Sequence, residues 1–170
     1  MNTKVKILGL DPGSRVTGYG LLELDTITNG YCYLVSGCIK AKAVELGGKL
    51  LYIYEQVKQL VQNYQPHEIA IERVFMKNNP DSAIKLGQAR GVAIAAALSH
   101  GASLAEYSPR VIKQAVVGYG NADKNQVQTM VKLMLQLPPS IDITLNDESD
   151  ALAIAICHAH SRKLNQLASR

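Results

Sequence analysis

The spacing of apolar residues changes at Leu46, and this change constrains the fold more than any other feature of the sequence. Before Leu46 the sequence favours strands, which we predict over residues 4–10, 16–24 and 31–39. Asn29-Gly30 supplies turn chemistry between the last two, so the three strands are expected to form an antiparallel meander. After Leu46, apolar residues recur every three or four positions as far as Tyr64, which indicates a helix ending before Pro66.

Strands and helices alternate in the rest of the chain. Further strands are predicted at residues 68–71 and 104–107, and helices at 82–98, 110–117, 124–137 and 147–164. This order predicts an α/β fold in which a mixed five-stranded sheet carries helices on both faces. The sequence contains no internal repeat or linker, so we predict a single domain over residues 1–170, with a core of about 4–160 and a short basic C-terminal tail.

Length and composition fit one soluble domain. The chain has 170 residues, of which 47% are apolar and 19% charged, and this is enough to bury a substantial core. Its longest mainly apolar stretch, residues 91–98, is far shorter than the roughly 20 residues that a membrane-spanning helix needs. The N-terminus has no signal-peptide pattern, so we expect a cytoplasmic protein with no membrane partner.

The cysteines and the net charge narrow the class further. Cys32, Cys38 and Cys157 are odd in number and form no Cys-x-x-Cys pair, which predicts reduced thiols without a disulfide framework or structural zinc. The formal net charge of +4 is compatible with a polyanionic partner.

Four acids stand at the ends of predicted elements. Asp11 ends the first strand and Glu72 ends the fourth, while Asp147 and Asp150 lie three residues apart at the start of the last helix. Each has an ordinary explanation by itself, in turn chemistry, a surface ion pair or helix capping. Taken together they indicate a site, because open α/β sheets build their sites at the carboxyl ends of strands.

Converging carboxylates would repel one another unless a cation lay between them. Mg²⁺ prefers oxygen ligands, and two ions about 4 Å apart activate water and stabilise the leaving oxygen of a phosphodiester. The spacing of the acids therefore predicts metal-dependent phosphoryl chemistry. The sequence offers no His or Cys cluster as a competing site.

Several sequence blocks, in order along roughly residues 4–160, resemble the RuvC family of Holliday-junction resolvases. The blocks are ILGLDPG (7–13), GYG (18–20), IERVF (71–75), DSA (81–83), LGQARG (86–91), YSPRVIKQ (107–114), VVGYG (116–120) and DALAIAI (150–156). The resemblance implies an RNase H-like fold and a homodimeric bacterial endonuclease of recombination and repair. Such an enzyme nicks two strands of a four-way DNA junction symmetrically and leaves 5′-phosphate and 3′-hydroxyl ends. It also implies two Mg²⁺ ions per subunit, replaceable by Mn²⁺, and RuvA and RuvB as branch-migration partners.

The same resemblance assigns the metal ligands and catalytic residues to Asp11, Glu72, Asp147 and Asp150. The segment before the last two varies in length within the family, so Glu148 is an alternative to Asp147. Helical geometry favours Asp147, because residues three apart share a helix face with Asp150 whereas residues two apart do not.

A further group of residues is expected to hold DNA. The basic members are Lys77, Lys85, Arg90, Arg110, Lys113 and Lys124. The resemblance places Lys113 and Lys124 close to the scissile phosphate. Phe75, the one phenylalanine of the chain, matches a residue that wedges into the junction, and Tyr119 is a weaker candidate for base stacking. The ordinary alternatives are solvated charges for the basic residues and a core position for Phe75.

Three functions from different classes remain open to the sequence. The first is a metal-dependent junction endonuclease, the second an actin- or hexokinase-like ATPase, and the third an inactive DNA-binding relative. For a dimer, the helix over 82–98 offers a ridge of small residues at Gly87, Gly91 and Ala95. The alternative is that this ridge packs on the protein's own sheet.

Overall fold

A computed structural model describes residues 3–73, 79–138, 141, 143 and 146–168. The strands are β1 (Lys4–Asp11), β2 (Val16–Asp25), β3 (Tyr31–Lys40), β4 (Glu68–Glu72) and β5 (Ser103–Tyr107). The helices are α1 (Leu46–Tyr64), α2 (Pro80–Leu98), α3 (Pro109–Val117), α4 (Lys124–Met134) and α5 (Asn146–Ala168).

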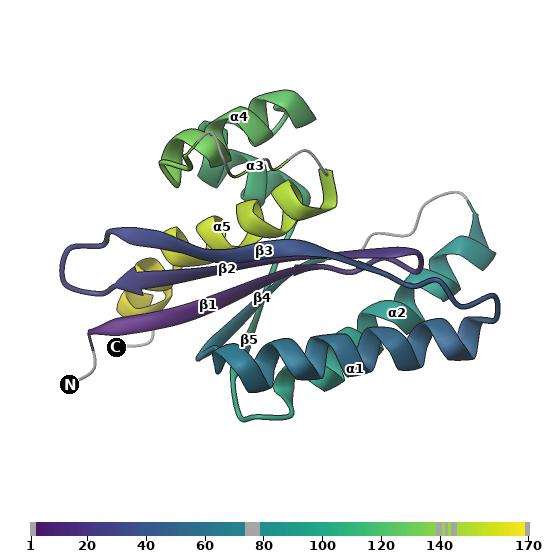
Figure 1. Ribbon diagram of the computed structural model, residues 1–170. Coiled ribbons are helices and arrows are strands. Elements are labelled where there is room, and N and C mark those ends of the chain that lie inside the picture. Colours follow the sequence, from purple (N-terminus) through teal and green to yellow (C-terminus); the bar gives the residue numbers. More distant parts are fainter. Residues whose placement is uncertain (1–2, 74–78, 139–140, 142, 144–145, 169–170) are drawn as a thin grey trace.

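The strands form one mixed sheet in the order β3-β2-β1-β4-β5. β1, β2 and β3 are the predicted antiparallel meander, while β1 pairs parallel with β4, and β4 with β5. In Figure 1, α1 and α2 lie below the sheet and α3, α4 and α5 lie above it. The predicted α/β class, with helices on both faces of a mixed five-stranded sheet, is confirmed.

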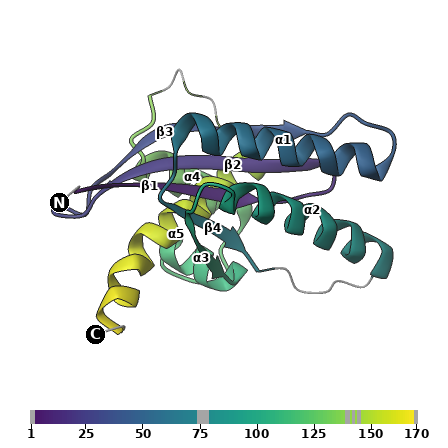
Figure 2. The same cartoon turned by 90° about the horizontal axis from the view of Figure 1, so that it is seen from below.

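Alternation along the strands divides the apolar core into two layers. On β1, Ile7 packs in the layer of α3, α4 and α5, whereas Leu8 and Leu10 pack in the layer of α1 and α2. Successive side chains of a strand point to opposite faces, so each residue's layer follows from its position. Figure 2 shows α1 and α2 side by side across their face of the sheet. By the same alternation, Asp11 and Glu72 lie on the α5 face.

Three glycines let α5 lie directly against the backbone of β1 and β2. A Cβ atom built on Gly9 would overlap the carbonyl oxygen of Ala151, and one built on Gly18 would overlap the carbonyl oxygen of Asp147. Any larger residue at these two positions would therefore push the start of α5 away from the sheet. We call this set the glycine surface: Gly9, Gly18 and Gly20.

A buried polar network attaches α5 to the sheet a second time. The His158 ring on α5 lies 2.7 Å from the Tyr107 hydroxyl through Nδ1 and 2.7 Å from the Glu68 carboxylate through Nε2. Arg162 donates from Nε to the same carboxylate at 2.8 Å. Although burial by itself raises the pKa of Glu68, the hydrogen bonds from His158 and Arg162 outweigh it and hold that pKa below its ordinary value.

Several predicted helix boundaries differ from the structure. α2 and α3 begin at Pro80 and Pro109 rather than at residues 82 and 110. The helix predicted to reach residue 137 ends at Met134, because Gln136 adopts a left-handed conformation with φ of 48° before the two prolines act. The last helix begins at Asn146, one residue before its predicted start, and continues to Ala168 through the segment predicted as a tail.

The small-residue ridge of α2 faces away from the sheet. Of the described residues, none comes within 4 Å of a Cβ built on Gly87 or Gly91, and both glycines are exposed, as is Ala95. The alanines that α2 buries are Ala89, Ala93, Ala96 and Ala97. The alternative that the ridge packs on its own sheet is therefore wrong.

Two expectations from composition can be compared with the structure. None of the described helices combines the length and apolarity needed to cross a membrane. All three cysteines are free thiols, as predicted, and burial raises the pKa of Cys38 and of Cys157 to about 11.

Gly9→Ala should lower the free energy of unfolding by roughly 2–3 kcal/mol, because the added methyl group overlaps backbone atoms that have nowhere to move. Gly47→Ala is the matched control. It lies in α1 with no described atom within 4 Å of the new Cβ, and should leave stability unchanged or raise it by up to about 1 kcal/mol. Urea denaturation of the two variants tests this, and equal stability would contradict the role of the glycine surface.

Candidate active site

Asp11 and Glu72 end neighbouring parallel strands. Leu10 on β1 is paired with Ile71 on β4, so the next residue of each strand is an acid on the α5 face of the sheet. On both strands, apolar residues lead to a carboxylic acid at the last position. Two acids distant in sequence are thereby placed side by side.

The turn after Asp11 is held by a buried side chain. Thr17 is fully buried, and its hydroxyl oxygen lies 3.2 Å from the carbonyl oxygen of Gly13 and 3.4 Å from its amide nitrogen. This closes the Asp11-Pro12-Gly13 turn against the start of β2. Because Asp11 is also paired with Gly18, the strand end is held on both sides.

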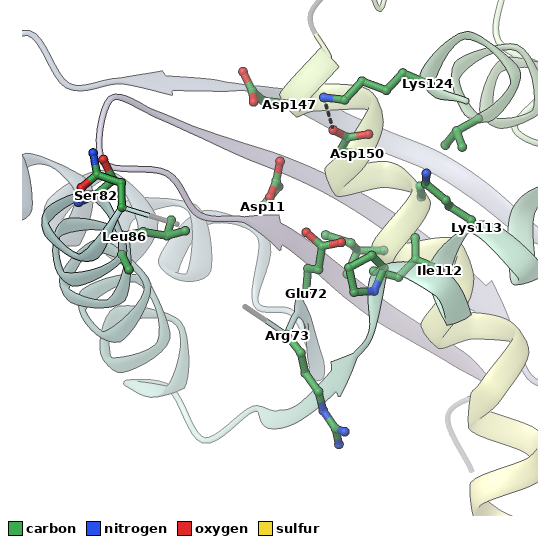
Figure 3. A pocket seen from close by; sticks show the side chains of 16 residues that line it. Asp11, Glu72, Arg73, Ser82, Leu86, Ile112, Lys113, Lys124, Asp147 and Asp150 are labelled. Atoms are coloured by element: carbon green, nitrogen blue, oxygen red, sulfur yellow. Dashed lines mark hydrogen bonds and ion pairs between the residues drawn. The ribbon is translucent and has the colours of Figure 1, made fainter. Parts of the chain in front are cut away.

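Asp147 and Asp150 project from the first turns of α5. Gly18 lies beneath the carbonyl group of Asp147, so the glycine surface sets the depth at which α5 presents both acids. Figure 3 shows the four carboxylates around one pocket, with α2 on one side and α3 and α5 on the other. The structure thus brings together all four acids that the sequence singled out.

This acidic pocket has a volume of about 550 Å³. Its charged lining residues are Asp11, Glu72, Arg73, Lys113, Lys124, Asp147 and Asp150. Its neutral lining residues are Asn79, Ser82, Ala83, Leu86, Pro109, Ile112, Val127, Ala153 and Ile154. Acids on the floor and lysines on one wall suit an anionic substrate bound through cations.

Burial and repulsion from neighbouring carboxylates raise the pKa of Asp11 and of Asp150. Burial raises the pKa of Asp11 to about 7, with further increases from the charges of Asp150, Glu72 and Asp147, and Lys124 opposes them. Burial also raises the pKa of Asp150, although the Lys124 ammonium, 3.5 Å from its carboxylate, counteracts this. A proton is therefore retained on Asp11 up to neutral pH when no cation neutralises the cluster.

The donor set suits a hard divalent cation, since carboxylate oxygens are the ligands that Mg²⁺ and Mn²⁺ prefer. The part of the Asp11 pKa increase that comes from neighbouring carboxylates shares its cause with cation affinity, because a proton or a cation relieves the same repulsion between like charges. Within the described residues, however, no three acidic, His or Cys side chains are already gathered closely enough to hold an ion. Asp150 is paired with Lys124 instead, so a bound cation would take the place of that ammonium.

Glu148, the alternative to Asp147, points elsewhere. Its carboxylate accepts a 2.5 Å hydrogen bond from the hydroxyl of Ser36 on β3. Asp147 lines the acidic pocket together with Asp150. The three-residue spacing places Asp147 and Asp150 on one face, as helical geometry predicts.

The basic residues fall into three groups. Lys113 and Lys124 line the acidic pocket, and the Arg110 side chain packs over Gly120 beside them. Lys85 is exposed on α2 and forms an ion pair with Asp81, and Arg90 forms one with Glu106. Phe75 and Lys77 lie outside the described residues. Tyr119 is 43% exposed, as a stacking residue requires.

The sequence analysis missed the wall of the acidic pocket that α2 contributes. Asn79 caps α2 by accepting a hydrogen bond from the Ser82 amide, and Ser82 and Leu86 face the acids one turn apart. The Asn-Pro-Asp-Ser helix start was the available signal. It reveals where the helix begins and not what the helix faces.

Comparisons with known proteins agree on one family. A family model described as crossover junction endodeoxyribonuclease RuvC matches residues 7–158. Proteins of that name from Legionella pneumophila (strain Paris) and Pseudomonas fluorescens (strain Pf0-1) are 55% identical over 157 residues and 53% identical over 156 residues. Each alignment covers 92% of this chain and 87% of the relative. The solved structure of T. thermophilus RuvC in complex with a Holliday junction substrate aligns with a TM-score of 0.85 at 28% identity, covering 95% of this chain and 96% of that one.

Asp11→Asn should stabilise the metal-free protein at pH 8. When an acid has a higher pKa in the folded state than in the unfolded state, the folded protein becomes less stable as the pH rises. For Asp11 this loss falls between about pH 4 and about pH 7. Removing the charge should raise the melting temperature in EDTA at pH 8 by roughly 3–8 °C, and by much less at pH 4.

Asp25→Asn is the control of opposite sign, because backbone hydrogen bonds from Ile27 and Thr28 lower the pKa of Asp25. It should bring no increase at either pH. A melting temperature of Asp11→Asn at or below that of the wild type at pH 8 would contradict the repulsion described above.

Proposed function

The chain belongs to the RuvC family of crossover junction endodeoxyribonucleases, and we propose that Asp11, Glu72, Asp147 and Asp150 are its catalytic metal ligands. The protein is an endonuclease that resolves Holliday junctions, and enzymes of this family are metal-dependent. The observation that carries the assignment is the convergence of four carboxylates, from β1, β4 and α5, on one pocket with two lysines at its edge.

The proposed cofactor is Mg²⁺, with two ions per subunit and Mn²⁺ as a substitute. When bound, such ions activate water and neutralise charge on the leaving oxygen of a phosphodiester. Asp11 and Glu72 would hold cations from the floor of the acidic pocket, and Asp147 and Asp150 from the start of α5. The products would carry 5′-phosphate and 3′-hydroxyl ends. Displacement of Lys124 from Asp150 would free its ammonium for the substrate phosphate.

DNA would approach across the wall made by α3 and α4. Lys113 and Lys124 point into the acidic pocket. These cations would contact phosphates, which position a duplex without reading its sequence. Phe75 is proposed as the residue that wedges into the junction, and Lys77 as a further phosphate contact. Lys85 is also proposed as a DNA contact, and to bind phosphate it would have to leave its ion pair with Asp81.

We also propose a symmetric homodimer, because one chain carries one set of four acids and a junction needs two opposed cuts. The exposed ridge of α2 is the proposed contact, since Gly87 and Gly91 leave open space for a second helix. Ile84, which is 62% exposed, extends the same helix face. Apolar surface of this kind is suited to burial against a partner copy.

RuvA and RuvB are the proposed partners, and the bacterial cytoplasm the proposed location. The relatives named above come from bacteria. Of the two other functions open to the sequence, the ATPase is excluded by family membership. The inactive DNA-binding relative is disfavoured because all four acids are present around the acidic pocket. A synthetic four-way junction incubated with Mg²⁺ and no nucleotide tests all three functions, and paired nicks are expected.

Asp11→Asn, Glu72→Gln and Asp150→Asn should each reduce junction cleavage by at least about 1000-fold while leaving junction affinity nearly unchanged. The acids are expected to act through the metal, whereas affinity arises mainly from lysine and arginine contacts with phosphate. Single-turnover cleavage in Mg²⁺ and binding in Ca²⁺, which should support binding without cutting, measure the two effects separately.

Asp147→Asn and Glu148→Gln form a matched pair for the register of α5. The first should behave like the other acids, and the second should retain most activity because Glu148 bonds to Ser36. The reverse result would move the ligand to Glu148. Full activity of Asp11→Asn would overturn the site as a whole.

Gly91→Arg should convert the dimer to a monomer without unfolding it, because the new side chain leaves the fold intact but blocks the α2 ridge. Sedimentation at micromolar concentration should show the wild type near twice the chain mass and the variant near one chain mass. In mixed dimers, one Asp11→Asn subunit should leave one strand uncut. Paired cuts by a strictly monomeric protein would contradict the symmetric mechanism.

A further inference from the structure

Arg90 is engaged inside the protein rather than presented to solvent. Its guanidinium Nη2 lies 2.6 Å from Oε1 of Glu106, and its Nε donates to the main-chain carbonyl oxygen of Glu72 at 3.4 Å. The Arg90 side chain is 19% exposed, compared with 67% for Lys124. A residue selected from the sequence as a DNA contact is thus bonded to the backbone of a proposed metal ligand.

Strand alternation explains how Arg90 reaches Glu72 from behind. Glu106 on β5 is paired with Ile71 on β4, and both lie on the face that α2 covers. Glu72 is the next residue, so its carboxylate points to the opposite face, where the acidic pocket lies. Arg90 on α2 therefore contacts the main chain of Glu72, and the Glu72 carboxylate remains directed at the other three acids.

Arg90 is ion-paired with a carboxylate that it shares with a second arginine. Glu106 accepts its short hydrogen bond, and Arg73 also approaches Glu106, with 3.9 Å between Nε and Oε2. The guanidinium is held through two of its donors, Nη2 to Glu106 and Nε to the Glu72 carbonyl oxygen, and this fixes the orientation of its plane. It is a weak ligand for phosphate, since DNA would have to compete with Glu106.

The hydrogen bond from Arg90 reaches the main chain at the end of β4. Glu72 is the last residue of the strand, and beyond it the amide of Arg73 donates to the carbonyl oxygen of Tyr107 at 2.7 Å. The hydrogen bond from Arg90 adds a donor from outside the sheet at the last residue of β4 that is paired with β5. It connects α2, β4 and β5 at the residue that must hold its carboxylate still.

We propose that Arg90 is a positioning residue for Glu72, with Glu106 as its anchor, and that it is not a DNA contact. The proposal rests on Glu72 being a metal ligand. Residues that orient ligands from behind commonly change activity or metal affinity by about 10- to 100-fold when they are removed. The same residue as a phosphate contact would instead affect binding and its salt dependence.

The test compares Arg90→Gln, Glu106→Gln and the double variant in the full-length protein. Single-turnover cleavage of a four-way junction should fall about 10-fold or more in Arg90→Gln, and the Mg²⁺ concentration for half-maximal rate should rise. Glu106→Gln should act in the same direction, and the double variant should be no worse than Arg90→Gln, since the two residues act as a unit. Junction affinity in Ca²⁺ and its salt slope should be unchanged.

Lys58→Gln on α1 is the control for loss of one positive charge in the same helical layer, and it should cleave and bind normally. The proposal is overturned if Arg90→Gln weakens binding and lowers the salt slope by about one while Glu106→Gln cleaves normally. It is also overturned if both variants cleave at the wild-type rate. If Arg90→Gln fails to fold by circular dichroism, Arg90→Lys and Glu106→Gln decide the question, because slower cleavage with intact binding is required of both.

Glu72→Gln separates this proposal from the assignment on which it rests. An inactive Glu72→Gln together with normal Arg90→Gln and Glu106→Gln refutes the positioning role alone. A fully active Glu72→Gln refutes the metal-ligand assignment, whatever the Arg90 variants do.

Discussion

The close approach of α5 to the backbone of β1 and β2 is the constraint on which the acidic pocket depends. At Gly9 and Gly18 no side chain separates the helix from the sheet, so the carbonyl groups of Ala151 and Asp147 rest where Cβ atoms would otherwise be. The position of α5 is therefore fixed by hard backbone contact rather than by adaptable side chains. The network of Glu68, His158, Tyr107 and Arg162 then holds the same helix at its far end.

The fixed position of α5 opposes the electrostatic repulsion among the four acids of the acidic pocket. Burial, together with the charges of Asp150, Glu72 and Asp147, raises the pKa of Asp11 to about 7, and the Lys124 ammonium offsets part of this increase. The fold keeps the acids together only because the apolar layers and the two attachments of α5 oppose their separation. As a metal site, the proposed cluster would trade folding stability for affinity toward cations, as functional sites often do.

Much of this could be predicted from the sequence because it depends on local periodicity. Strand alternation places Asp11 and Glu72, which end two mainly apolar strands, on the same face of the sheet. The three-residue spacing along α5 places Asp147 rather than Glu148 on the helix face of Asp150. The topology that brings the strand ends together was expected from the family resemblance.

What could not be predicted depends on partners distant in sequence. Arg90 resembles any basic helix residue until Glu106 is placed opposite it, and Gly18 resembles a turn or strand glycine until α5 lies on it. The end of α4 was misplaced because a left-handed Gln136 stops the helix before the prolines do. The proposed nuclease centre draws its acids from β1, β4 and α5, and this has one consequence during synthesis of the chain. Because α5 is the last described element, a ribosome still making the chain, or a protease that has removed its end, leaves a protein without Asp147 and Asp150 in place. Under the proposed assignment such incomplete copies would lack half of the metal ligands, and cutting would begin only when the sheet and its final helix have folded together.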